Sequence, residues 1–427
     1  MKEFIGYRRE FHKHAEVSWT EIRTTARVVE ILRNLGLEKL YIGEDAVDTS
    51  ILTFPLDLTE ATRKANMRRA IEEGAKPEIV RETKGYPGVV CIIDTGTPGP
   101  VQALRFDMDA LPYDECEDED FRPVTEGYRS LHSGAVHACG HDAHTAIGLG
   151  LAKEIAEHKD EYTGIIKLIF QPAEETNKGA VSIVSKGHLD DVDRFFAVHL
   201  ALSYQNEPLP SHSMCCGVKD FMSCHQMDVI FRGRAAHPCG AAQEGRNALL
   251  AACSCSLAIH NIANHEKGLT RANVGAISGG DCTNTICDEC KIKLEFRGEY
   301  PEISAYMEER VMQCVKGSAI QYGVEYEIID YGETPVARSD DKLMEEVKEI
   351  AEGVDWFENV YYEGNLGGSD DAAAMMARTQ KNGGAAAYIG IGCDITAPLH
   401  HPRFDFDEGC MEPTIELLSK LLKNVKH

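Results

Sequence analysis

The 427-residue sequence lacks any apolar run that approaches the roughly 18 residues needed to cross a bilayer. Its first stretch, MKEFIGYRREFHKHAE, is charged and lacks the apolar core and small-residue cleavage site of a secretory signal. Basic residues are scarce: 44 Lys and Arg stand against 69 Asp and Glu, a formal net charge of −25. Such a chain repels nucleic acid and anionic membranes, so we expect neither as a partner and expect a cytoplasmic protein.

Internal repeats and low-complexity tracts are also missing. The 15 cysteines are odd in number and scattered, unlike those of a small disulfide scaffold. We expect reduced thiols, most of them buried as small hydrophobic residues, with one or two able to bind metal. The length is about two to three times that of a typical domain, so we expect two domains.

Strands and helices alternate over the first half of the chain and again near its end. Ser18 or Thr20 could cap a first helix, and residues 56–86 form a charged, helix-prone stretch that we expect to be a surface insertion. The alternation predicts an α/β/α sandwich with a mainly parallel sheet, where chemistry gathers beyond the carboxyl ends of the strands. The expected strands are 88–94, 101–106, 165–170, 195–200 and 386–392, and the expected helices are 143–158, 179–187, 341–352 and 408–422.

The middle of the chain follows another order, strand-helix-strand-strand-helix-strand, which is the split βαβ pattern of a ferredoxin-like sandwich. We therefore expect a catalytic domain of residues 1–221 and 331–427, interrupted by a smaller α+β domain at 222–330. The elements of the insert are expected at 227–233, 245–262, 270–278, 290–298, 301–322 and 324–332.

The segment VHACGHDAH, residues 136–144, gathers five possible metal ligands. Thiolate and imidazole suit zinc, and manganese or cobalt if oxygen ligands join them. Cys139 and His141 would point to one side of an extended loop, and His141 and His144 would share a helix face. Two other interpretations stay open: ordinary loop residues with Asp142 as a helix cap, or a local structural zinc knuckle.

Further candidate ligands follow other expected strands. Glu174 and Glu175 end the apolar run LIFQP, where one could bind metal and the other act as a general base, or both could be a solvated pair at a helix start. His199 ends FFAVHL, and His400 and His401 follow the last strand; each alone could be an ordinary core or loop histidine. Together with Cys139 and His141 they exceed what one tetrahedral zinc needs, which favours two ions about 3.5–4 Å apart.

These motifs resemble the aminoacylase and carboxypeptidase-G group of co-catalytic metallopeptidases. The resemblance is strongest to the amidohydrolase branch with hippurate hydrolases, auxin-conjugate hydrolases and the A chain of p-aminobenzoyl-glutamate hydrolase. The insertion at 56–86 and the stretch CGVKDFMS at 216–223 favour the last type. The matching segments are RREFHKHAE (8–16), RFDMDALP (105–112), HACGHDAHTA (137–146), FQPAEE (170–175), AVHL (197–200), GRAAHP (233–238), GGSDD (367–371) and LHHPRFDFDE (399–408).

The resemblance implies roles in the catalytic domain. Glu174 would be the general base, and His400 rather than His401 has the family's spacing to Phe404. Asp107 and Asp109 would be structural or would support the ligands, because the histidine ligand of related branches has no counterpart beside them. The implied ligands of two divalent ions, zinc or manganese with cobalt possible, are Cys139, His141, Glu175, His199 and His400.

The resemblance also implies roles for the insert, which would serve in dimerisation or as a lid. His237 would stabilise the oxyanion in the active site of the neighbouring protomer, although a surface-loop histidine is the simpler interpretation. Asn284 and Arg297 would hold the substrate carboxylate, but NTIC at 284–287 departs from the family pattern and Arg297 could be an exposed strand residue. Outside the insert, the residues GNLGGSDDAA themselves would place Ser369 at a helix start, where it would bind an anion or merely cap that helix.

The expected activity is hydrolysis of the amide bond of an N-acyl or N-aroyl amino acid, with p-aminobenzoyl-glutamate or a similar N-acyl glutamate as favoured substrate. The expected assembly is a homodimer, or a heteromer with a similar chain. Three alternatives stay open: a dipeptidase or aminoacylase of other specificity, a binding module with one structural zinc, and a non-catalytic or regulatory subunit.

Overall fold

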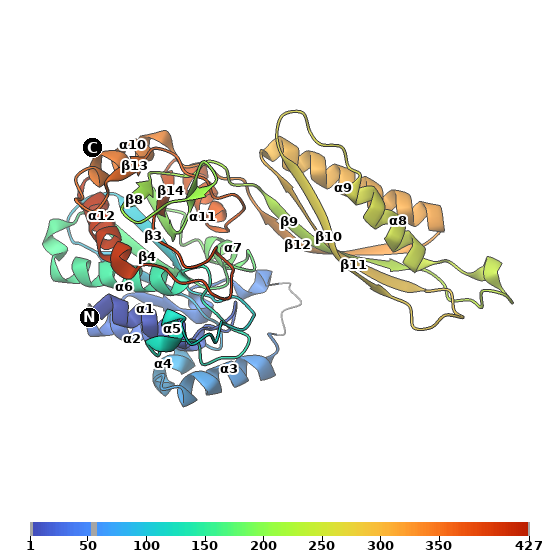
Figure 1. Ribbon diagram of the computed structural model, residues 1–427, viewed down its shortest axis with the longest axis horizontal. Helices are drawn as coiled ribbons and strands as arrows, with labels where there is room; N and C mark the ends of the chain where they lie inside the picture. Colours follow the sequence, from blue (N-terminus) through green and yellow to red (C-terminus); the bar gives the residue numbers. More distant parts are fainter. Residues whose placement is uncertain (1–2, 53–57, 426–427) are drawn as a thin grey trace. The chain divides into compact units, whose positions relative to one another are not determined.

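Figure 1 shows the computed structural model, which describes residues 3–52 and 58–425. The chain forms two compact units: Met1–Asp220 with Ala337–His427, and Phe221–Val336. The second unit is therefore inserted into the first. No helix within the described ranges is long and apolar enough to cross a membrane.

The first unit is built on a twisted sheet whose central strands run parallel. β3 pairs with β4 and with β5, and β5 pairs with β14, all in parallel register, so their carboxyl ends meet at one edge. β1 and β2 add antiparallel strands on one side, and β8 joins β14 in antiparallel register on the other. The order is β1 (Leu40–Ile42), β2 (Val89–Asp94), β4 (Ile165–Gln171), β3 (Val101–Asp107), β5 (Arg194–Leu200), β14 (Ala385–Ile391), β8 (Ser213–Cys215), β13 (Asn359–Tyr361).

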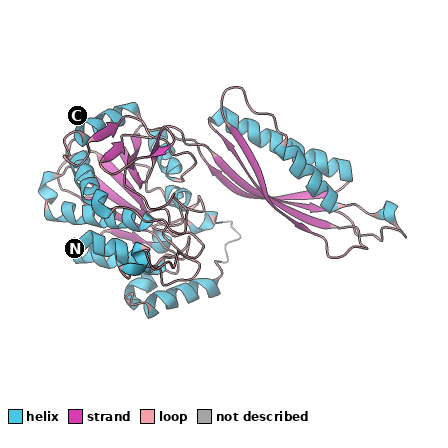
Figure 2. Ribbon diagram, viewed as in Figure 1, coloured by secondary structure: helices cyan, strands magenta, loops and turns pink. Residues whose placement is uncertain are grey.

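Helices cover both faces of this sheet (Figures 1 and 2). α6 packs on β3, β4 and β5, and α7 and α11 lie across the sheet from it. α6 approaches so closely that a Cβ at Gly148 would lie 2.6 Å from the ring of Phe106. The expected mainly parallel α/β/α architecture is confirmed. Its helices are α1 (Glu3–Lys13), α2 (Ile22–Asn34), α6 (His141–Glu157), α7 (Gly179–Ser185), α10 (Asp341–Ala351), α11 (Ala372–Lys381) and α12 (Met411–Lys423).

The charged stretch expected as an insertion forms two helices, α3 (Glu60–Glu72) and α4 (Pro77–Glu82), that pack against α2 and each other. Residues 56 and 57 of this stretch lie outside the described residues. Most side chains of α3 are exposed, as expected of a surface segment. The predicted cap of α2 is wrong: Glu21 occupies the N-cap position, and Ser18 instead donates its hydroxyl to Asp109.

The second unit has the β-α-β-β-α-β order expected from the sequence. Its strands pair antiparallel in the order β10, β11, β9, β12, and α8 and α9 lie side by side on one face (Figure 1). This is the ferredoxin-like arrangement. Its elements are β9 (Cys224–Arg232), α8 (Ala248–His260), β10 (Thr270–Gly279), β11 (Glu289–Gly298), α9 (Pro301–Tyr322) and β12 (Glu325–Thr334).

Candidate metal centre

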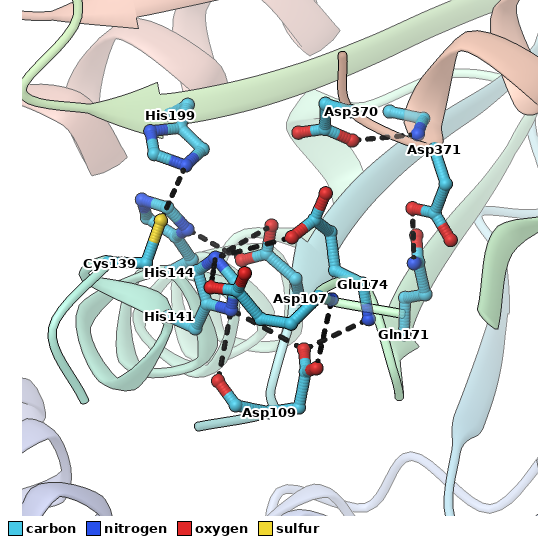
Figure 3. Close-up of polar contacts among 12 residues, drawn as sticks. Asp107, Asp109, Cys139, His141, His144, Gln171, Glu174, His199, Asp370 and Asp371 are labelled. Carbon is cyan, nitrogen blue, oxygen red and sulfur yellow. Dashed lines mark hydrogen bonds and ion pairs between the residues drawn. The ribbon is translucent and has the colours of Figure 1, made fainter. Parts of the chain in front are cut away.

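Polar side chains from six segments meet where the parallel strands of the first unit end. The segments end or follow β3, β4, β5 and β14, begin α6, or precede α11, and Figure 3 labels residues of all of them except the one after β14. Several groups of their side chains place one potential ligand atom each within 4.8 Å of one another. These groups are Cys139 with Glu175 and His400, His141 with Glu174 and Glu175, Asp107 with His141, His144 and His199, and Glu174 with Asp370 and Asp371.

His141 is the first residue of α6 and is completely buried. Its Nδ1 lies 3.0 Å from the carbonyl oxygen of Asp109, so Nδ1 carries the proton and donates it there. Its Nε2 is buried and makes no hydrogen bond within the described chain. Because a neutral imidazole with Nδ1 protonated has its lone pair on Nε2, this ring is held as a metal ligand would be.

His199 has the same arrangement at the end of β5. Its Nδ1 lies 2.7 Å from the carbonyl oxygen of Leu200, which leaves Nε2 as an acceptor 3.5 Å from the Cys139 sulfur. The extended conformation expected between Cys139 and His141 is wrong, because Gly140 adopts a left-handed conformation with φ 91°. The turn at Gly140 lets α6 begin at His141 while Cys139 stays among the candidate ligands.

Asp109 fixes the main chain that carries the two glutamates. Its carboxylate accepts the backbone N–H groups of both Glu174 and Glu175, each at 3.0 Å, and the Ser18 hydroxyl at 2.6 Å. Just before them, the N–H of Ala173 donates to the buried Glu21 carboxylate at 2.7 Å, and Ala173 has φ 54°. The turn after β4 is thus held by two buried carboxylates that the sequence pattern did not connect with it.

Both glutamates face the buried histidine. Glu174 Oε2 lies 3.9 Å and Glu175 Oε1 4.0 Å from His141 Nε2. Burial raises the pKa of Glu175 to about 7, and burial and the neighbouring carboxylates raise the pKa of Glu174 well above its usual range. Glu175 Oε1 is buried without a hydrogen-bond partner in the described chain. Two carboxylates are costly to bury side by side in their charged form unless positive charge lies close to them. Divalent cations would supply that charge, and the donor set of carboxylates, imidazoles and a thiol fits them.

His400 completes the arrangement from the loop after β14. Its Nε2 lies 3.6 Å from Glu175 Oε1, and its backbone N–H donates to the carbonyl of Ala138 at 2.8 Å. His401 is exposed, and its Nδ1 accepts the backbone N–H of Arg403. His400 is therefore the one of the pair that lies beside the candidate ligands.

Asp107 and His144 belong to the same buried cluster and were not predicted as a pair. His144 Nδ1 lies 2.5 Å from Asp107, and its Nε2 accepts the N–H of Leu200 at 3.0 Å. Both ring nitrogens are thus engaged, so His144 holds the Asp107 carboxylate and the main chain at Leu200. The other Asp107 oxygen receives Arg105, which also binds Asp370 at 2.9 Å. The sequence indicated only that His144 would share a helix face with His141. It carried no signal for the contact between His144 and Asp107.

The remaining predicted residues lie elsewhere in the fold. Ser369 is partly exposed before α11, and Asp370, rather than Ser369, accepts the N–H of Ala372 at 2.7 Å. His237 and Asn284 are exposed residues of the second unit, and Arg297 binds both oxygens of Glu295 at 3.1 Å. His237 Nδ1 accepts the N–H groups of residues 239 and 240, so its proton is on Nε2.

Comparison with known proteins decides the family. Residues 103–424 match the peptidase family M20/M25/M40. The chain belongs to this family. It is 39% identical to an indole-3-acetyl-aspartic acid hydrolase of Enterobacter agglomerans, with 98% of this chain and 95% of the relative aligned. It is 38% identical to the A chain of the p-aminobenzoyl-glutamate hydrolase of Escherichia coli K12, with 98% and 94% aligned.

Solved structures agree with this assignment. The aminobenzoyl-glutamate utilization protein of Klebsiella pneumoniae superposes with a TM-score of 0.79 at 34% identity, covering 98% of this chain and 95% of that one. The expected family is therefore confirmed. The chain belongs to the M20/M25/M40 family, and its relatives that align over nearly their whole length are hydrolases. The chain is therefore a metal-dependent amidohydrolase.

Proposed function

We propose that the chain hydrolyses the amide bond between an acyl or aroyl group and an acidic amino acid, using two divalent cations held at the candidate metal centre. One observation carries the proposal: buried, unsatisfied ligand atoms from segments far apart in the chain, His141 Nε2 and Glu175 Oε1, face one another at the carboxyl edge of the sheet. The proposed ligands are Cys139, His141, Glu175, His199 and His400.

When bound, the cations would supply one thing, a lower pKa for the attacking water. Glu174 accepts a proton from the water whose oxygen attacks the amide carbonyl, and later passes that proton to the leaving nitrogen. Burial and the neighbouring carboxylates raise the pKa of Glu174, which strengthens the carboxylate as a base. His237 of a neighbouring protomer, with its proton on Nε2, would donate a hydrogen bond to the oxyanion.

The favoured substrate class comes from two relatives with different acyl groups. One is named for indole-3-acetyl-aspartate and the other for p-aminobenzoyl-glutamate, so an acidic amino acid is the part that their substrates share. We favour p-aminobenzoyl-glutamate or a similar N-acyl glutamate. Arg297, with Asn284, is the proposed partner of the free α-carboxylate: its guanidinium binds Glu295 as a fork in this structure and would exchange that carboxylate for the substrate's.

The test is a hydrolysis panel on chelator-treated chain reloaded with zinc, manganese or cobalt. We expect no turnover without metal and cleavage of p-aminobenzoyl-glutamate and indole-3-acetyl-aspartate in preference to the matching glycine conjugates. Equal rates on acidic and glycine conjugates would place the chain with aminoacylases of other specificity. Measuring the chain alone and mixed with a similar partner chain separates a self-sufficient homomer from one component of a heteromer.

A further inference from the structure

A second group of metal-type ligands lies outside the candidate metal centre, where three distant segments of the first unit meet. His14 follows α1, Glu73 caps the carboxyl end of α3, and His132 lies in the loop before α6. One ligand atom from each of the three lies within 4.8 Å of the other two. Two imidazoles and a carboxylate are a ligand set that zinc binds in proteins.

The His132 ring is oriented as a ligand. Its Nδ1 lies 2.6 Å from the carbonyl oxygen of Ala15, so that nitrogen donates its proton and Nε2 faces the Glu73 carboxylate at 2.7 Å. A backbone carbonyl on the other ring nitrogen is the usual support of a metal-binding histidine. The same contact also suits a plain ion pair between a protonated His132 and Glu73, so His132 alone does not decide between them.

His14 separates the two possibilities. Its Nδ1 lies 3.5 Å from Glu73 Oε2, and both atoms are buried without a hydrogen-bond partner in the described chain. An ion pair between His132 and Glu73 uses the other carboxylate oxygen, so these two atoms are satisfied only when a proton on His14 or a bound cation lies between them. Two ligands about 2.0–2.2 Å from a tetrahedral ion lie roughly 3.3–3.6 Å apart, which matches the 3.5 Å between His14 Nδ1 and Glu73 Oε2.

We infer that His14, Glu73 and His132 form a third metal site. A zinc ion bound there would hold α3 against the rest of the first unit. All three side chains retain 17–20% exposure, which leaves room for a water molecule as fourth ligand. Arg69, a cation on the same helix, is directed to Glu16 at 2.8 Å and to the carbonyl of Thr20 at 3.1 Å. The site thus has one carboxylate to balance the ion.

The test uses the full chain, stripped with chelator, reloaded with zinc and freed of loose metal by gel filtration. Zinc per chain is measured for wild type, Glu73→Gln, His14→Gln and the control His158→Gln, a surface histidine paired with Glu154. We expect wild type and control to hold about one zinc more than either site variant. His14→Gln is the decisive variant, because a simple pair of Glu73 and His132 does not need His14.

Amide hydrolysis is measured on the same samples, since it reports on metal bound at the catalytic centre and not on zinc bound at the proposed third site. Retained activity together with the loss of one zinc supports a separate site. Anomalous diffraction at the zinc edge on the wild type does not depend on the folding of any variant, and should give a peak among His14 Nδ1, Glu73 Oε2 and His132 Nε2. The absence of that peak, or equal zinc in wild type and both variants, overturns the proposal.

Discussion

Replacing Asp109 with asparagine should damage catalysis without removing any group that touches the substrate. Its two carboxylate oxygens accept the N–H groups of Glu174 and Glu175 at 3.0 Å each, and Ser18 Oγ lies 2.6 Å away. Asparagine keeps one acceptor oxygen and turns an NH₂ group toward the other N–H. One charge-assisted hydrogen bond, about 1.5–3 kcal/mol, is then lost and replaced by a contact between two donors.

The damage falls on the turn that positions both glutamates. We expect Asp109→Asn to lower kcat/KM or metal affinity by the roughly 10–100-fold that a lost supporting contact costs at a metal site. The assay is release of p-aminobenzoate from p-aminobenzoyl-glutamate over a metal titration. If excess metal restores the activity, the defect lies in metal binding through Glu175. If the activity stays low at saturating metal, the defect lies in proton transfer by Glu174.

Ser18→Ala is the matched control. It removes one hydrogen bond to the same carboxylate and leaves both acceptors for the main-chain N–H groups, so we expect a loss of less than about tenfold, in line with a single hydrogen bond of about 0.5–1.5 kcal/mol. Unchanged kcat/KM and unchanged metal affinity in Asp109→Asn would refute the positioning role. An equal loss in Ser18→Ala would show that the two N–H contacts are not what matters.

Three further predictions address the base, the second unit and acid stability. Glu174→Gln should keep its metal content and lose about 10²–10⁴-fold in kcat, the usual contribution of a general base, and a rate near wild type would rule Glu174 out. His237→Ala should lower kcat with metal content unchanged, and normal turnover would remove it from the mechanism. Burial opposes the charge of Asp405, but Arg8 and Arg122 outweigh it and hold its pKa below the usual range. The ionised Asp405 therefore contributes its full stabilisation above the unfolded pKa of about 3.9 and loses it as the pH falls through the lower folded pKa. Melting temperatures measured between pH 5 and 2 should therefore fall less steeply in Asp405→Asn than in the wild type. An unchanged slope would contradict this.

The sequence could predict which segments carry candidate ligands, because the rule it uses is topological. Runs such as FFAVHL and IIKLIFQ are mostly apolar and do not alternate with polar residues, as is typical of parallel strands covered on both faces. The residues that end them then meet at one edge wherever the strands lie in the sheet. His199 and Glu175 could therefore be grouped before the strand order was known, and β4 could lie between β2 and β3 without changing the result.

The supports of those residues could not be predicted in the same way, because they depend on contacts with no spacing rule. Ser18 carries the pattern of a helix cap, yet its hydroxyl is committed to Asp109, 91 positions away. Arg105 interrupts an apolar strand and would be taken for an exposed residue, but it is fully buried against Asp107 and Asp370. A charge in that position is tolerable only when partners from other segments surround it. Sequence patterns thus identify chemistry that needs particular residue types at strand ends, whereas the buried contacts that set the orientation of those residues depend on how distant loops fold over the sheet.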